Sequence, residues 1–415
     1  VSVGSQSLDA NTSGNNNTAV GRLALTHATT ASNNTAVGTQ SLQANTTGYS
    51  NSALGRQALI ANTEGNNNNV IGEAAAYNNT TGSNNNVMGR AAFYSNTTGS
   101  NNTALGQSAM NANTTADNNT AVGSSALQLN TTGQNNTAVG VQALYQNTTA
   151  SNNTAVGYDA LGDCTTGFSN VAVGHNAMNA LTDADENTAI GKDALGALTT
   201  GNYNTAIGFE SLASITTGTQ LVAVGRHALY SNSTGTQNTA LGYSGLYANT
   251  TGTSNTAAGY FALGSNTTGG NNTAFGRDAL YNNTASNNTA VGHYALRATT
   301  TGEQNIAVGS YDNDANSTGN HNVAVGYQAL TENTSSNNTA IGHVAMYANT
   351  TGTQCVAVGY AALDANTTAD NNTAIGYASL TTNTTGASNT GVGNASLQNC
   401  STGHSNSTLG YYTLQ

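Results

Sequence analysis

The sequence has no proline and no tryptophan, and only 6% of its 415 residues are charged and 6% aromatic. Its 7 basic residues stand against 18 acidic ones, and this net charge of -11 excludes the basic surface that nucleic-acid binding needs. No run of 18 apolar residues occurs, so no membrane-spanning segment is expected. No basic-then-apolar stretch at the start marks a signal peptide. A chain this polar is disordered unless a repeat organises it.

The chain does repeat. A glycine closes a string similar to Asn-Thr-Ala-Val-Gly at 25 positions between Gly4 and Gly410, and we call these residues the anchor glycines. Of the 24 intervals between them, 22 are 17 residues long and two are 16. Disordered low-complexity sequence does not keep such a register, so one continuous repeat array is predicted over residues 1–415.

The residues of the repeat favour β-structure over helix. Asn, Thr and Gly are poor helix formers, and a 17-residue period continues no heptad seam. Short alternating strings such as Thr-Ala-Val-Gly are bounded by Asn and Gly turn residues, which is typical of strands. The sequence therefore predicts an all-β fold, a parallel β-solenoid of about 25 coils, in which each coil is a flattened loop of two short strands and two turns.

Repetition gives 25 versions of each position, and the substitutions within a column indicate which columns are buried. The residue before each anchor glycine (the Val column) is always apolar, and the residue four after it (the Leu column) is Leu or Met in 22 coils. We predict that these two columns form the core, flanked by Ala. The Thr column, three before the glycine, is replaced by Val171, Val222 and Ile306 in some coils and is also expected to face inward.

Two Asn columns are predicted to be buried as well. One lies seven after the anchor glycine (the turn-side Asn column, Asn45 and Asn62), and the other lies four before it (the strand-side Asn column, Asn34 and Asn102). Their substitutes include Leu, Ile and Cys, so we expect inward-facing amides that form hydrogen-bonded ladders along the axis. Three of the substitutes are cysteines, and we expect free buried thiols there, with bridging between chains as the alternative: Cys164, Cys355 and Cys400.

Two further columns carry aromatic and basic residues and are predicted to face water. The Tyr/Arg column lies one after the anchor glycine, and the second Tyr column lies five after it. Aromatic rows of this kind can bind sugars or other flat groups. The candidate surface-binding residues are Tyr77, Tyr94, Tyr145, Tyr158, Tyr230, Tyr243, Tyr247 and Tyr260.

Many Asn-x-Thr strings begin five before the anchor glycine, in a column (the outer Asn column) whose variability predicts exposure. They are candidate N-glycosylation sites, with unmodified turn chemistry as the alternative: Asn16, Asn33, Asn101, Asn118, Asn152, Asn271, Asn287, Asn337 and Asn371. No metal-binding His/Cys cluster, calcium-binding repeat or catalytic triad is apparent. We therefore expect no enzyme activity, no catalytic residue, no metal and no cofactor.

The strings Asn34-Thr-Ala-Val-Gly38 and Asn305-Ile-Ala-Val-Gly309 resemble the Asn-Ser-Val-Ala-Ile-Gly head repeats of YadA-like trimeric autotransporter adhesins. The longer pattern that begins Gly326-Tyr-Gln-Ala-Leu330 is similar to repeats of phage tail fibres and surface fibres. This resemblance implies an extracellular structural or adhesive fibre, assembled as a trimer or end to end, with a host-surface or glycan receptor as partner. The alternative is a monomeric solenoid that binds ice or a small ligand.

Overall fold

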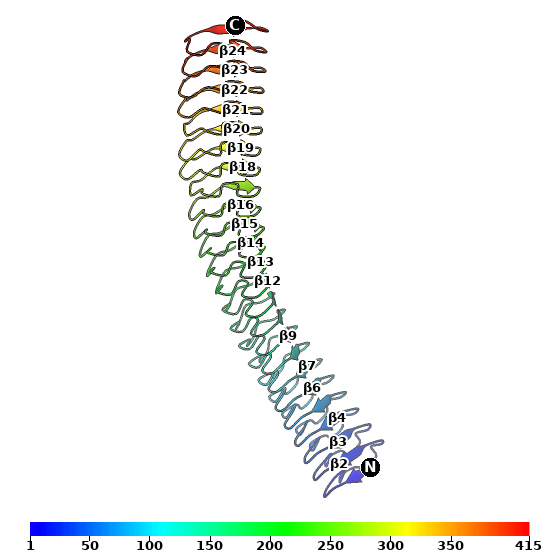
Figure 1. The fold of residues 1–415 in the computed structure, drawn as a ribbon. Helices are drawn as coiled ribbons and strands as arrows, with labels where there is room; N and C mark the ends of the chain where they lie inside the picture. Colours follow the sequence, from blue (N-terminus) through cyan, green and yellow to red (C-terminus); the bar gives the residue numbers. More distant parts are fainter. Residues whose placement is uncertain (415) are drawn as a thin grey trace. The chain divides into compact units, whose positions relative to one another are not determined.

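The computed structural model describes residues 1–414 and is all-β, with 25 parallel strands in a solenoid of about 24 turns (Figure 1). No helix occurs among those residues. By their contacts the residues group into two compact units, Val1–Phe209 and Glu210–Gln415, and the same 17-residue repeat runs through both.

The strands of the first unit are β1 (Ser2–Val3), β2 (Thr18–Val20), β3 (Thr35–Val37), β4 (Ser52–Leu54), β5 (Asn69–Ile71), β6 (Asn86–Met88), β7 (Thr103–Leu105), β8 (Thr120–Val122), β9 (Thr137–Val139), β10 (Thr154–Val156), β11 (Val171–Val173), β12 (Thr188–Ile190) and β13 (Thr205–Ile207). The strands of the second unit are β14 (Val222–Val224), β15 (Thr239–Leu241), β16 (Thr256–Ala258), β17 (Thr273–Phe275), β18 (Thr289–Val291), β19 (Ile306–Val308), β20 (Val323–Val325), β21 (Thr339–Ile341), β22 (Val356–Val358), β23 (Thr373–Ile375), β24 (Thr390–Val392) and β25 (Ser407–Leu409).

Each coil holds one strand of two or three residues, not the two strands that the sequence predicted, and turns make up the rest. Within each unit, strands of successive coils pair in parallel at equivalent repeat positions, as Ala138 does with Ala155. The 16-residue coils keep this register, because Thr273 still pairs with Thr289. The missing residue is therefore absorbed in a turn, as the sequence predicted.

The coil closes through backbone conformations that most residues avoid. The anchor glycine has φ between +118° and +157°, and a Cβ on Gly21 would lie 2.5 Å from the carbonyl oxygen of Gly38. Only glycine fits such a close approach between coils. Two residues further on, and again in the Leu column, the backbone is left-handed, as at Gln40 (φ 60°) and Leu42 (φ 50°).

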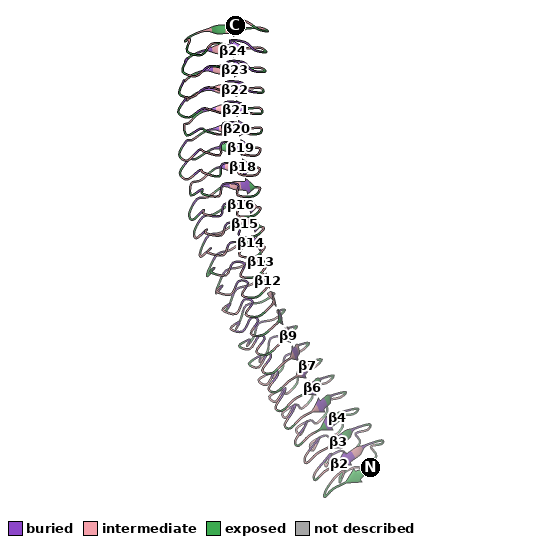
Figure 2. Cartoon of the chain, viewed as in Figure 1, coloured by how far each residue is buried: buried purple, intermediate pink, exposed green. Residues whose placement is uncertain are grey.

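The interior of the coil is lined by Ala and Leu. Ala36 and Ala53, two before the anchor glycine, are buried, and so are Ala58 and Ala143, three after it. The Leu column is buried in every coil except the first and the last, as at Leu42, which confirms the prediction for that column. Figure 2 shows that buried, half-buried and exposed segments follow one another along the coils.

The Val column faces outward, so its prediction as core was wrong. Leu54 is 49% exposed, Met88 51% and Phe275 45%. The Thr column is exposed or half-buried on the same face, with Ile306 at 43% exposure. Side chains alternate along a strand, and the small Ala between these two columns is the residue that points inward. A narrow interior has room for Ala but not for a row of larger side chains.

Both Asn columns are buried and form ladders, as predicted. In the turn-side Asn column, the Nδ2 group of Asn62 donates to Oδ1 of Asn45 at 2.8 Å and to the carbonyl of Gly65 at 3.0 Å. In the strand-side Asn column, the backbone N–H of Asn51 donates to Oδ1 of Asn34 at 2.9 Å. Where the ladder is continuous, an amide thus pairs with its own turn and with the amide of the adjacent coil.

Two buried side-chain oxygens without a hydrogen-bond donor lie where a cysteine interrupts the turn-side Asn column. Oδ1 of Asn147 has no donor, and the next residue of its column is Cys164. Oδ1 of Asn383 also has none, and Cys400 follows it. The ladder runs in one direction, from each Nδ2 to the preceding Oδ1, so an interruption leaves one oxygen unpaired.

Candidate functional site

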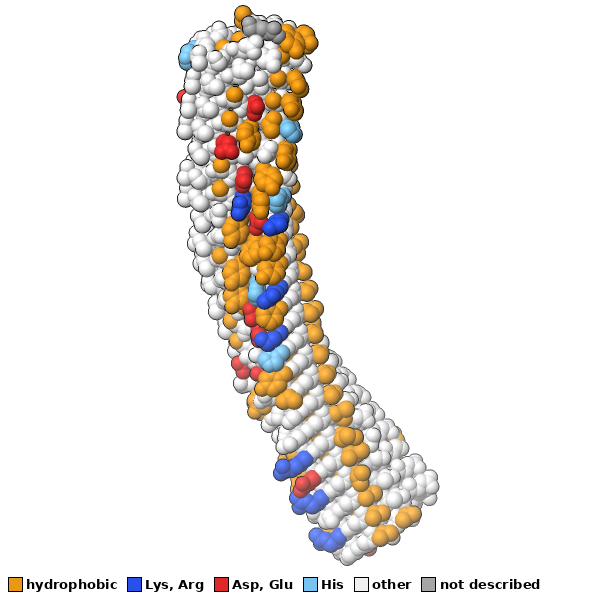
Figure 3. All heavy atoms as spheres, in the orientation of Figure 1, with side chains coloured by type: hydrophobic (Ala, Val, Ile, Leu, Met, Phe, Trp, Pro, Cys, Tyr) orange, Lys and Arg blue, Asp and Glu red, His pale blue; other side chains and the backbone are white. Residues whose placement is uncertain are grey.

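The Tyr/Arg column lies on the outer surface, immediately after each anchor glycine. Tyr158, Tyr243 and Tyr260 are 40–49% exposed, which confirms the predicted exposure. Figure 3 shows basic, acidic and His side chains on the face in view, interspersed with hydrophobic ones.

The rings of this column stack on one another. Tyr243 and Tyr260 lie with centroids 5.3 Å apart and ring planes 13° apart. Arg226 lies over Tyr243 at 5.9 Å, and Arg277 lies over Tyr260 at 5.5 Å, so a cation covers each end of the pair.

A longer stack lies in the second unit. The centroid separations from Tyr327 to His343, Tyr360 and Tyr377 are 5.4, 5.3 and 5.1 Å in turn. In this arrangement neighbours occupy the faces of the inner rings, and ring edges and hydroxyl groups point to water. A ligand would therefore meet edges and hydroxyl groups.

The other candidate Tyr residues follow the same pattern. Tyr77 stacks on Tyr94 at 4.9 Å and Tyr230 on Tyr247 at 5.3 Å, and all four are half-buried in the second Tyr column. Tyr145 is half-buried in that column too. Tyr158 stacks on His175 at 5.3 Å. The structure thus joins the predicted residues into axial pairs rather than into one pocket.

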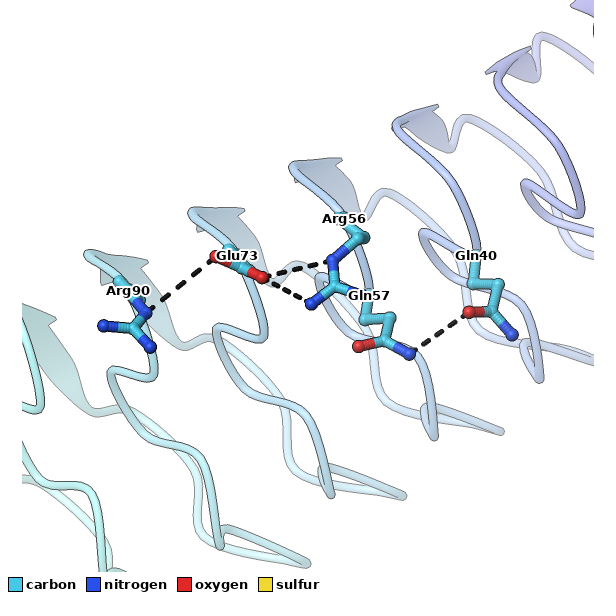
Figure 4. A network of polar contacts seen from close by, with 5 residues as sticks. All are labelled: Gln40, Arg56, Gln57, Glu73 and Arg90. Carbon is cyan, nitrogen blue, oxygen red and sulfur yellow. Dashed lines mark hydrogen bonds and ion pairs between the residues drawn. The ribbon is translucent and has the colours of Figure 1, made fainter.

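Charged residues of the Tyr/Arg column also pair along the axis (Figure 4). The Nε group of Arg56 donates to Glu73 at 3.1 Å, and Arg90 approaches the other carboxylate oxygen of Glu73 at 3.9 Å. The hydrogen bond from Arg56 lowers the pKa of the Glu73 carboxyl. In the adjacent column Gln57 donates to Gln40 at 3.1 Å.

The Val and Thr columns form a second candidate surface, which we call the apolar strip. It comprises the Val-column and Thr-column residues of each unit, and Figure 3 shows its hydrophobic side chains as a row along one edge of the molecule. In the first unit a shallow depression of about 230 Å³ lies on the strip between Val37, Leu54 and Ile71. Because the sequence predicted the Val column to be core, it missed this surface.

The nine candidate glycosylation residues are all exposed, as predicted for the outer Asn column. Their backbone is left-handed, with φ of 57° at Asn16 and 63° at Asn33, a conformation that Asn tolerates better than most residues. The Nδ2 group of Asn16 donates to Oδ1 of Asn33 at 3.1 Å. Turn formation therefore already explains Asn in this column, and attachment of a glycan stays a prediction.

The three cysteines are free, as predicted within one chain. Cys164 and Cys355 are buried and Cys400 is half-buried. Burial raises the pKa of the Cys164 thiol to about 12 and that of Cys355 to about 11, so neither forms a reactive thiolate at neutral pH. Within residues 1–414, no three His, Cys, Asp or Glu side chains are placed to hold a metal ion.

Asp312 is a buried carboxylate that the sequence analysis did not single out. It replaces an Ala of the interior and accepts hydrogen bonds from the backbone N–H of Gly326 at 2.8 Å and of Ala329 at 2.9 Å. Its neighbour Asn313 replaces a Leu, and the Asn313 Nδ2 group has no hydrogen-bond partner. In the sequence, the only indication of this buried carboxylate is that two adjacent core positions depart from the repeat consensus.

Comparison with known proteins adds no family to these observations. No protein-family model matches the chain, and no curated protein matches it. Among residues 1–414, no helix is long and apolar enough to cross a membrane.

Proposed function

We propose that this chain is the shaft of an extracellular, non-catalytic fibre with a structural or adhesive role. The observation that carries the proposal is the axial direction of its bonding. Strand pairs, Asn ladders and stacked rings all join a coil to the next coil, as Asn62 joins Asn45 and Tyr260 joins Tyr243. Within each unit, such bonding holds every coil to its neighbours and supports a shaft that resists stretching along its axis.

The outer surface also suits a shaft. Its charged and aromatic side chains satisfy one another along the axis, as Arg56, Glu73 and Arg90 do, instead of converging on one cleft. With only 7 basic residues in 415, few sites are open to trypsin-like proteases. Both features fit a protein that is exposed outside the cell.

The location can be tested by immunogold labelling of intact source cells or particles with antibodies raised against the purified chain. We expect gold along surface filaments, with the same labelling after mild trypsin treatment. Labelling only after the cells or particles are opened would contradict an extracellular fibre.

The adhesive role is assigned to the aromatic rows, where hydroxyl groups and ring edges face out. Replacing Tyr230 and Tyr247 with Ser should reduce binding of the chain to glycan-coated surfaces if these residues contact the receptor. The control is Gln40→Ser with Gln57→Ser, which removes another axial pair. Equal binding by both variants and the unmodified chain would leave a purely structural shaft.

One observation favours a second function, that of a monomeric ice-binding solenoid. The Thr column faces water, so its supposed inward direction no longer argues against ice binding. The neighbouring Val column varies from Ala258 to Phe275, and such an uneven row fits a regular ice lattice poorly. Thermal hysteresis in a solution of the purified chain would favour this second function over the fibre.

A further inference from the structure

The Val column combines two properties that conflict for a surface in water. It is exposed in 14 coils and half-buried in the other 11, with Val139 at 37% exposure, Ile190 at 40% and Leu241 at 42%. It is nevertheless apolar in all 25 coils. An isolated exposed Leu is ordinary, but a continuous exposed apolar row marks a surface that is covered in use.

The Tyr/Arg column provides an internal comparison, because it is exposed in 22 of its 25 coils and lies only two residues further along the chain. Val141 at 45% and Tyr158 at 49% are typical of its exposure. Its residues nevertheless include Arg56, Glu73 and Gln107. Exposure to water therefore does not restrict a column of this chain to apolar residues, and the Val column must be restricted by something else.

The Thr column extends the same strip. It holds 15 Thr, six Val or Ile, two Ser and two Asn, and neither column of the strip contains a charged residue. The two columns belong to the same strands and are separated by about 7 Å. Each unit therefore presents a flat, uncharged ribbon two side chains wide, bordered by the polar Tyr/Arg column.

We propose that the apolar strip is covered by the strip of a second copy of this chain, lying alongside the first. This inference rests on the proposed fibre function and identifies the surface through which the fibre assembles. A partner must present apolar groups at about 4.8 Å intervals along at least the thirteen strands β1–β13. The chain itself has that periodicity, and two uncharged strips meet without repulsion between like charges.

The available area is sufficient for a specific interface. At the exposures given above, one coil offers on the order of 100 Å² from its Val and Thr side chains, so the first unit alone offers on the order of 1,000 Å². A specific interface of standard size needs about 800 Å² from each partner. The two strips would pack face to face, as sheets do in a β-sandwich at about 10 Å, and the Tyr/Arg columns would stay in water.

The test compares two double variants of the full chain. The strip variant is Val122→Lys with Val139→Lys, and the matched control is Ser124→Lys with Val141→Lys, which places the same charges on the same two coils. Sedimentation equilibrium at protein concentrations of roughly 1 to 50 μM, a range suited to interfaces of this size, gives the mass of each assembly. Circular dichroism verifies that the β-structure of both variants is retained.

We expect the unmodified chain and the control to sediment at a multiple of 41.6 kDa and the strip variant at 41.6 kDa. If the strip variant loses β-structure, Val122→Ser with Val139→Ser replaces it, and weaker association than the control is expected. The proposal is overturned if the unmodified chain is a monomer, or if the strip variant and the control associate equally. A monomer with thermal hysteresis that the strip variant lacks would assign the strip to ice instead.

Failure of this proposal and failure of the fibre function give different results. If the strip variant still associates and surface filaments are labelled with gold, the fibre function stands and its interface lies on another surface. Absence of surface labelling would remove the extracellular fibre whatever the sedimentation result.

Discussion

The one-way direction of the turn-side Asn ladder predicts that three substitutions destabilise the protein less than one. Asn79 is buried, its Nδ2 group donates to Oδ1 of Asn62 at 2.8 Å, and its own Oδ1 accepts from Asn96 at 2.6 Å. Replacing Asn79 with Leu, which has nearly the same shape and occurs in this column at Leu181 and Leu198, leaves Oδ1 of Asn62 without a donor. A buried polar atom without a partner costs about 2 kcal/mol.

The triple variant Asn45→Leu, Asn62→Leu and Asn79→Leu removes the ladder from its first member, because Ala28 precedes Asn45 in the column. No Oδ1 is then left unpaired. The carbonyl groups of Gly48, Gly65 and Gly82 keep donors from the strand-side Asn column, as Asn34 donates to Gly48 at 2.9 Å. The expected cost is therefore close to zero, against about 6 kcal/mol if three equal losses were added.

Native-state hydrogen exchange, read by mass spectrometry on peptides that cover residues 59–99, measures the local opening free energy in each variant. Asn78→Leu is the matched control, because this half-buried neighbour lies outside the ladder, and we expect a change below about 0.5 kcal/mol. A triple variant that opens more easily than Asn79→Leu would refute the one-way ladder as the source of stability.

Three further predictions concern individual buried or strained residues. Burial raises the pKa of Asp312 to about 6. Its contribution to stability is therefore present below its unfolded pKa near 4 and is lost as the pH rises through 6. The gain in melting temperature from Asp312→Ala should be larger at pH 7.5 than at pH 4.5, and a gain independent of pH would contradict this. Val344 is β-branched and has a left-handed backbone with φ of 48°. Replacing it with Asn, which tolerates this conformation better, should raise the melting temperature and increase the free energy of unfolding by about 1 kcal/mol. An unchanged melting temperature would show that the backbone there is unstrained. Because their pKa values are raised to about 12 and about 11, Cys164 and Cys355 should react with a thiol reagent at pH 8 only after denaturation, and rapid labelling of the folded chain would contradict their burial.

The sequence predicted the repeat, the parallel β-solenoid and both buried Asn columns, because substitutions among 25 coils carry information on burial. It did not predict which side of the strand faces inward. In the string Thr35-Ala36-Val37 both Ala and Val are apolar, and a shift by one residue inverts every side chain. The size of the residues held the missing signal: the Val column ranges from Ala258 to Phe275, which a close-packed interior would not accommodate.

The candidate surfaces were predictable only in part. The exposure of Tyr158, Tyr243 and Tyr260 followed from variability, but the stacking of their ring faces depends on the spacing between coils and needed coordinates. The apolar strip was not predicted, because its composition is that of a buried column. A column that is apolar because a partner covers it has the same composition as one that is apolar because the protein's own interior covers it.

The nearest-neighbour bonding of the coils has a consequence for how a gene of this kind changes. Unequal recombination between repeats adds or deletes multiples of 51 nucleotides, which encode one 17-residue coil. A new coil finds on both sides the partners that its Asn, Ala and Leu residues require, so duplication extends the interior without disturbing it. Shaft length can therefore evolve in steps of about 4.8 Å, independently of the residues displayed on the outside.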